Sequence, residues 1–135
     1  MDNSINAFDQ IDEYAKKIDM VTQLDVTNVL DKQLSAPNVK HEWIYKLVQH
    51  KRKLLELMEK KENYIAAKYG ENPLGVSKAA IKFKAESDID ILKLNREIRH
   101  HELLVEYLDM AVNKIFSQMG FDFKNLVELM KMENL

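Results

Sequence analysis

Residues 91–119 read ILKLNREIRHHELLVEYLDMAVNKIFSQM, and apolar side chains recur there in alternating steps of three and four. The positions of this seam are Ile91, Leu94, Ile98, His101, Val105, Leu108, Val112, Ile115 and Met119. A repeat of about 3.5 residues is typical of a helix that packs along a partner helix. We expect His101, the polar member, to be hydrogen-bonded at a helix interface.

Further apolar side chains lie beside the seam, at Leu92, Leu104, Tyr107, Ala111 and Phe116. One partner helix cannot cover two faces of the same helix. Long helices with more apolar surface than one thin subunit buries should associate. The sequence therefore predicts a homo-oligomer.

Caps and periodicity elsewhere predict an all-α fold of about five helices in a single domain over residues 1–135. The expected helices cover residues 4–19, 25–35, 37–69, 77–119 and 122–133, with a loop over 70–76. The two long helices, 37–69 and 77–119, form an elongated helical hairpin.

The expected boundaries rest on residues that commonly begin or end helices. Ser4 caps the first helix, Asp25 caps the second, and Pro37 opens the third because proline suits the first helical turn. Gly120 ends the long seam helix, and Asp122 caps the last one. These positions set the predicted lengths of all five helices.

The composition excludes several classes of protein. The 135 residues contain no Cys, which removes disulfides, thiolate zinc sites and cysteine nucleophiles. Three Gly and two Pro are too few for the frequent turns of an all-β fold. No stretch approaches the ~18 apolar residues of a membrane span, and residues 1–20 lack a signal-peptide pattern. We expect a soluble, cytoplasmic protein that does not bind membranes.

Charge is unevenly distributed along the chain. Residues 40–84 carry eleven basic and five acidic side chains, whereas residues 1–31 carry two basic and seven acidic ones. A basic middle between acidic ends points to a polyanionic partner, although a solvated charged face is the alternative.

The helix over 37–69 carries the clearest chemical pattern. Its apolar stripe is formed by Ile44, Leu47, Val48, Leu54, Leu55, Met58 and Ile65. Beside it, an arc of about 100° holds Lys46, His50, Lys53, Leu57, Lys60, Lys61, Tyr64 and Lys68. Mobile cations with an aromatic ring among them suit single-stranded DNA, whose phosphates they follow and whose bases stack on the ring.

Further cations extend the candidate interface. Lys78, Lys82 and Lys84 lie just across the loop. The full set of candidate contacts to single-stranded DNA is Lys46, His50, Lys51, Arg52, Lys53, Lys60, Lys61, Tyr64, Lys68, Lys78 and Lys82.

Catalytic patterns are weak. Glu97 and His100 have the Glu-x-x-His spacing of di-iron bundles, but such sites need two of these motifs and the chain has one. Glu86, Asp88 and Asp90 are better explained as a solvated acidic face than as an acid–base pair. No phosphate-binding glycine loop is present. We expect no enzyme, no metal site and no cofactor.

The order of landmarks resembles the UvsY recombination mediator family of T-even-type bacteriophages. The resemblance runs from Asp25 to Tyr69 and from about Lys78 to Glu133. Its matching positions are Trp43 with Lys46, Lys51-Arg52, Leu55, Lys61, Ala67-Lys68, the block Asp88–Lys93, Leu108 and Gly120-Phe121. The family's basic motif falls on residues 66–69, where Lys68 is the one matching cation.

The resemblance implies a recombination mediator. Such a protein binds single-stranded DNA coated by the phage single-strand DNA-binding protein and helps the phage RecA-like recombinase to load, in recombination, replication and repair. It acts in the cytoplasm of the infected bacterial host as a hexameric or heptameric ring. The C-terminal segment would hold that ring through Phe121, Phe123, Leu126, Val127 and Met130.

A second hypothesis comes from a different functional class. The seam could belong to a non-enzymatic helical adaptor or coiled-coil oligomerisation protein that binds a protein partner, with the basic face serving only as soluble surface. Salt separates the two, since DNA binding weakens steeply with salt and an apolar interface does not.

Overall fold

The computed structural model describes residues 3–25, 27–70 and 77–133, and this part of the chain is helical with no strand. Its elements are α1 (Asn3–Thr22), α2 (Val29–Tyr69), α3 (Lys78–Glu86), α4 (Ile89–Met110), the π-helical turn η1 (Ala111–Ile115) and α5 (Phe116–Glu133). The prediction of an all-α fold is confirmed.

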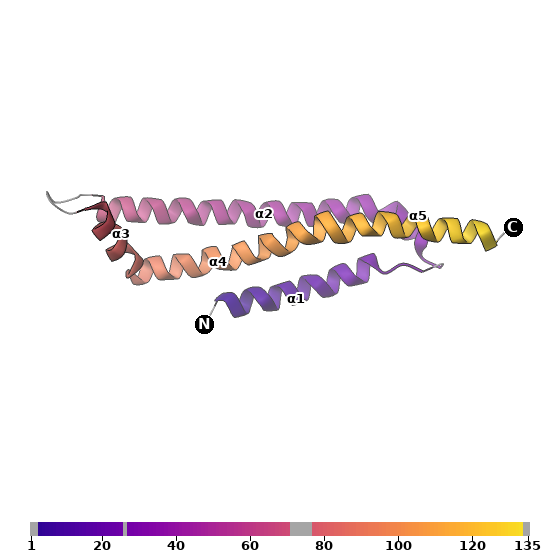
Figure 1. The fold of residues 1–135 in the computed structure, drawn as a ribbon, viewed down its shortest axis with the longest axis horizontal. Helices are drawn as coiled ribbons and strands as arrows, with labels where there is room; N and C mark the ends of the chain where they lie inside the picture. Colours follow the sequence, from indigo (N-terminus) through magenta and orange to yellow (C-terminus); the bar gives the residue numbers. More distant parts are fainter. Residues whose placement is uncertain (1–2, 26, 71–76, 134–135) are drawn as a thin grey trace.

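The molecule is a long helical hairpin with one additional, shorter helix packed along it. Figure 1 shows α2 running in one direction and α4, η1 and α5 returning beside it, with α3 across the turn and α1 alongside α4. The expected hairpin is therefore present, and α1 supplies the second cover that the seam helix needs.

Two cores divide the hairpin into a thick and a thin end. At the thick end, Tyr14 and Ile18 of α1 pack with Trp43 and Leu47 of α2 and with Leu108 of α4. At the thin end, Leu57 of α2 is buried against the α4 side chains Ile91, Leu94 and Ile98. The partly buried Leu54, Tyr64 and Ile65 of α2 pack against this smaller core. Most of the predicted seam is buried, which confirms its role as the packing face.

The expected helix over 77–119 is divided, which corrects the prediction. It is interrupted at Ser87 and Asp88, where the Asp88 side chain accepts a hydrogen bond from the backbone N–H of Asp90 and caps α4. Aspartate is a strong N-cap residue because its carboxylate satisfies an N–H of the first turn. The chain therefore starts a new helix just before the seam.

The predicted boundary between 25–35 and 37–69 is also wrong, because α2 continues through Pro37. Proline removes one hydrogen bond, here to the carbonyl of Gln33, and both residues are exposed so that water can solvate this carbonyl. Ala36 and Val39 pack against the thick core on the other side. Tertiary packing thus outweighs the local preference. Within the expected short helix, Val26 lies outside the described residues.

The expected helix end at Gly120 and the start over 122–133 are wrong as well, since α5 runs from Phe116 to Glu133. Phe116, Met119 and Phe123 are all buried, so continuous packing outweighs the ~1 kcal/mol cost of a helical glycine. Asp122 accepts a hydrogen bond from Gln118 within this helix and caps nothing.

The remaining boundaries agree more closely. α1 begins at Asn3, so Ser4 lies inside the helix and is not its cap. α2 ends at Tyr69 as predicted. In the expected loop over 70–76, residues 71–76 lie outside the described residues. No helix in the described part of the chain is long and apolar enough to cross a membrane.

Candidate nucleic-acid interface

The exposed cations of α2 lie in its central part. Lys51, Arg52, Lys53 and Lys60 are all exposed, and no acidic side chain among the described residues forms an ion pair with any of them. Cations outside ion pairs are available to neutralise the phosphates of a nucleic acid.

The face of α2 that packs inward differs from the predicted one. Leu57, expected within the basic arc, is buried against α4, whereas Val48, Leu55 and Met58 of the expected apolar stripe are exposed. Lys53 and Lys60 remain at the open edge of the arc. The arc is therefore partly a packing face, and several of its other members make contacts inside the protomer.

Lys46 and Lys61 are half-buried rather than open. The Lys46 ammonium lies 4.6 Å from the ring centre of Trp43 and 5.4 Å from that of Tyr14. Cation–π contacts of this kind hold a lysine stem against aromatic faces while its head stays near water. Lys61 borders a groove between α2 and α4 that Arg99 and Glu102 also line.

His50 lies in a hydrogen-bonded chain between three helices. The Gln10 amide donates to the Tyr14 hydroxyl over 2.8 Å, that hydroxyl lies 3.0 Å from His50 Nε2, and His50 Nδ1 lies 3.1 Å from His101 Nδ1. Both histidine rings can be neutral with every contact satisfied. The Tyr14 hydroxyl then donates to His50 Nε2, and His50 Nδ1–H donates to His101 Nδ1. Burial lowers the pKa of His101 to about 4 and also lowers the pKa of His50.

The histidine chain changes the predicted role of His50. Its ring is engaged between α1, α2 and α4, and a neutral ring brings no positive charge to a phosphate. The expectation for His101, a hydrogen-bonded residue at a helix interface, is confirmed.

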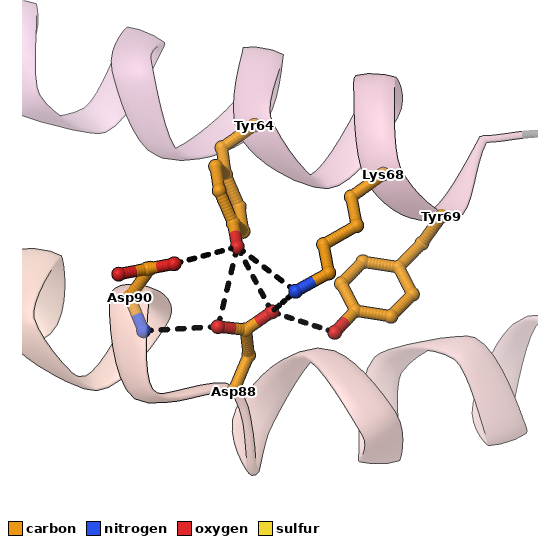
Figure 2. Close-up of polar contacts among 5 residues, drawn as sticks. All are labelled: Tyr64, Lys68, Tyr69, Asp88 and Asp90. Carbon is orange, nitrogen blue, oxygen red and sulfur yellow. Dashed lines mark hydrogen bonds and ion pairs between the residues drawn. The ribbon is translucent and has the colours of Figure 1, made fainter.

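Asp88 is the centre of the second polar cluster, shown in Figure 2. The side chain of Asp88 is only 3% exposed, and its carboxylate accepts hydrogen bonds from Lys68 Nζ at 2.7 Å and Tyr69 Oη at 2.7 Å. Tyr64 Oη lies 3.1 Å from the same carboxylate and 3.1 Å from that of Asp90. The end of α2 is thereby fastened to the start of α4.

The electrostatics of this cluster favour the ion pair. The hydrogen bond from Lys68, followed by that from Tyr69, holds the pKa of Asp88 well below its usual range. The hydrogen bond to Asp88, followed by that to Tyr64, holds the pKa of Lys68 above its usual value. Asp88 is thus a buried cap and anchor, which corrects its interpretation as part of a solvated face.

Two candidate DNA contacts belong to this cluster. Lys68 binds Asp88 and lies 5.5 Å from the ring centre of Tyr64 and 5.7 Å from that of Tyr69. The Tyr64 ring is half-buried with its hydroxyl engaged. Both side chains therefore help to close the hairpin. Ser87-Asp88 before the seam is the capping signal that could have indicated the anchor.

The lysines of α3 are open. Lys78 and Lys82 are exposed, as is Lys84, and in the described part of the chain no carboxylate pairs with them. The predicted contacts thus divide into an open group (Lys51, Arg52, Lys53, Lys60, Lys78 and Lys82) and a group engaged within the protomer (Lys46, His50, Tyr64 and Lys68), while Lys61 is half-buried at the groove between α2 and α4.

A family sequence profile described as "Recombination, repair and ssDNA binding protein UvsY" matches residues 16–134. The chain belongs to the UvsY family. The crystal structure of the bacteriophage T4 recombination mediator protein UvsY matches with a TM-score of 0.78. The match covers 91% of this chain and 98% of that one at 16% identity.

These comparisons confirm the resemblance to UvsY and its fold. The profile begins at residue 16, within α1, so it includes α2 and the returning helices α4 and α5 in full. At 16% identity the structural match establishes the UvsY fold alone. No curated protein sequence matches the chain significantly.

The five predicted oligomer contacts of the C-terminal segment all belong to α5 but lie on different sides of it. Phe123 is buried in the thick core of the protomer, and Leu126 and Met130 pack against that core. Val127 is half-buried, whereas Phe121 is 65% exposed. Of the five, Phe121 has the most surface for a neighbouring subunit.

Proposed function

We propose that this UvsY-family chain is a recombination mediator that binds single-stranded DNA and promotes loading of a phage RecA-like recombinase. Its substrate is DNA coated by the phage single-strand DNA-binding protein, during homologous recombination, recombination-dependent replication and repair. The observation that carries the proposal is the group of exposed cations in the middle of α2, none of which pairs with an acidic side chain of the described residues, in a chain of this family. The protein makes and breaks no bond and uses no cofactor or metal.

The open cations suit binding without sequence preference. Lys53 and Lys60 lie two helical turns apart, about 10 Å at 1.5 Å per residue, so they can contact different phosphates of an extended strand. Phosphate contacts carry no base information, and affinity then depends mainly on counterion release. Such binding accommodates any sequence that undergoes recombination.

Assembly multiplies these contacts. We place the protein in the host cytoplasm as a ring of six or seven copies, supported by apolar side chains that the protomer leaves exposed. A strand held by one subunit is at high effective concentration for the next, so modest contacts add up. A strand held in this way would favour recombinase over coat protein only through differential affinity.

A salt titration tests the DNA-binding part. A fluorescent single-stranded oligonucleotide is titrated with protein at several salt concentrations, and light scattering gives the particle mass. With about five phosphates neutralised, the slope of log K against log salt is roughly −3 to −4. An assembled particle that does not bind DNA at low salt would contradict the proposal and favour the helical adaptor.

Recombinase loading is tested separately. Recombinase activity on oligonucleotides coated with single-strand binding protein is measured with wild-type protein and with Lys53→Ala/Lys60→Ala. The variant should bind DNA more weakly and load less recombinase, with unchanged helicity and mass. Full loading by the variant would show that these cations do not serve the function.

A further inference from the structure

α3 is a short helix at the closed end of the hairpin (Figure 1). The Ser77 side chain caps it by accepting a hydrogen bond from Ala80 N, and Ala85 on its inner side is buried. Directly after α3, Asp88 binds the end of α2. Because Ala85 is buried, the opposite side of α3 faces outward.

That outer face presents an aromatic ring. Phe83 is 72% exposed, more than Phe8 or Phe121, the other large exposed phenylalanines in the described part of the chain. Burying a phenylalanine stabilises a fold, and this ring leaves most of that contribution unused. This exposed ring is therefore a candidate contact for a ligand.

The charges around the ring indicate which ligand. Lys82 and Lys84 flank Phe83 in the sequence, at about 100° to either side on the helix, and Lys78 lies one turn before Lys82, about 140° from Phe83. No acidic group in residues 3–25, 27–70 or 77–133 pairs with these lysines. A ring between unpaired cations suits a chain with phosphates and flat bases.

We propose that α3 is a base-stacking platform for single-stranded DNA, with Phe83 against a base and Lys82 and Lys84 on the flanking phosphates. This inference rests on the proposed function and names the residues that carry it. It also replaces Tyr64 as the stacking ring, because the Tyr64 hydroxyl is bound to Asp88 and the Lys68 ammonium lies beside its ring.

The test removes the ring and keeps every charge. Affinity for a fluorescent oligothymidine is measured for wild type and Phe83→Leu at several salt concentrations. Loss of one stacked base weakens binding about 10-fold. The salt slope stays unchanged, because no cation has been removed. Phe83→Tyr retains wild-type affinity, and an abasic oligonucleotide binds wild type and Phe83→Leu equally.

A matched control comes from α1. Phe8 is 56% exposed on a helix in the acidic N-terminal part of the chain, and Phe8→Leu makes the same substitution away from the lysines. It should leave affinity unchanged. Circular dichroism and light scattering confirm that each variant keeps its helicity and mass.

A Phe83→Trp variant reports contact directly. The single native tryptophan, Trp43, is buried in the thick core, so fluorescence added by the new ring and quenched by oligonucleotide comes from α3. Quenching supports stacking, and its absence with DNA bound overturns the inference.

The outcomes separate this inference from the proposed function. If wild type does not bind single-stranded DNA, the proposed function fails. If wild type binds with the expected salt slope and Phe83→Leu binds equally well, only the stacking platform is overturned. A loss of particle mass in Phe83→Leu would make the ring a contact between subunits and would also overturn it.

Discussion

Asp88 has two structural roles at one position. Its Oδ1 accepts the N–H of Asp90 and caps α4, while its Oδ2 accepts from Lys68 and Tyr69 at the end of α2. Hydrogen bonds to an ionised carboxylate are stronger than neutral ones. The thin end of the hairpin has a small apolar core, so this carboxylate carries an unusual share of its closure.

Removing the negative charge of Asp88 should lower the thermal stability of the protein in a pH-dependent way. The pKa of Asp88 is lower in the folded chain, so its stabilisation is complete above the unfolded value of about 3.9 and is lost as pH falls below it. Asp88→Asn should therefore melt at a lower temperature than wild type at pH 7, with the gap narrowing below pH 4. Thermal melts from pH 7 to pH 2 measure this gap.

A second aspartate provides the control. Asp122 is exposed and accepts one hydrogen bond from Gln118 within α5, so Asp122→Asn should melt close to wild type at every pH. A gap for Asp88→Asn that stays constant down to pH 2 would show that its ionised form is not what closes the hairpin.

At the scale of elements, Gly120 shows how packing outweighs a local stop signal. The residue lies inside α5, and a Cβ added there would meet nothing within 4 Å. Gly120→Ala should therefore raise the free energy of unfolding by about 0.5–1 kcal/mol, because alanine has the higher helix propensity. Denaturant unfolding followed by circular dichroism measures the change.

The comparison variant lies one turn before it. Ser117→Ala, at an exposed position of the same helix, should change stability by less than about 0.5 kcal/mol. A destabilised Gly120→Ala protein would indicate that a neighbouring subunit approaches this backbone closely.

The seam was predictable because its period of 3.5 persists through many residues, and no local residue choice changes it. Pro37 and Gly120 were wrongly predicted to be helix boundaries. Their local costs inside a helix, about 3 and 1 kcal/mol, are smaller than the stabilisation from the packed residues around them. The orientation of α2 was harder to predict, since apolar side chains such as Leu55 and Leu57 occur on two faces. Only the position of α4 decides which face turns inward.

For the same reason the candidate site was predicted only in part. Composition located the basic region, and Lys53 and Lys60 lie open as expected. Engagement of Tyr64 and Lys68 depends on Asp88, which lies about twenty residues further along the chain. Contacts between distant residues leave no periodic pattern in a single sequence.

For the whole molecule, the uncovered outer face of α2 is the main clue to assembly. Val48 is 41% exposed, Leu55 66% and Met58 42%, and their steps of seven and three residues place them on one side of the helix. α1 and α4 both pack elsewhere on α2. An apolar row of this length is typical of a surface covered by another copy.

A charge in the middle of that row should separate the copies and thereby weaken DNA binding. Leu55→Lys puts an ammonium where apolar contact is expected, so light scattering should show a smaller particle with unchanged helicity. The added cation alone would strengthen DNA binding, whereas loss of avidity weakens it, and we expect at least a 100-fold net loss of affinity. Met20→Lys, at a 71% exposed position of α1, is the control and should keep both mass and affinity. A smaller Leu55→Lys particle that binds DNA as tightly as wild type would show that assembly does not serve binding.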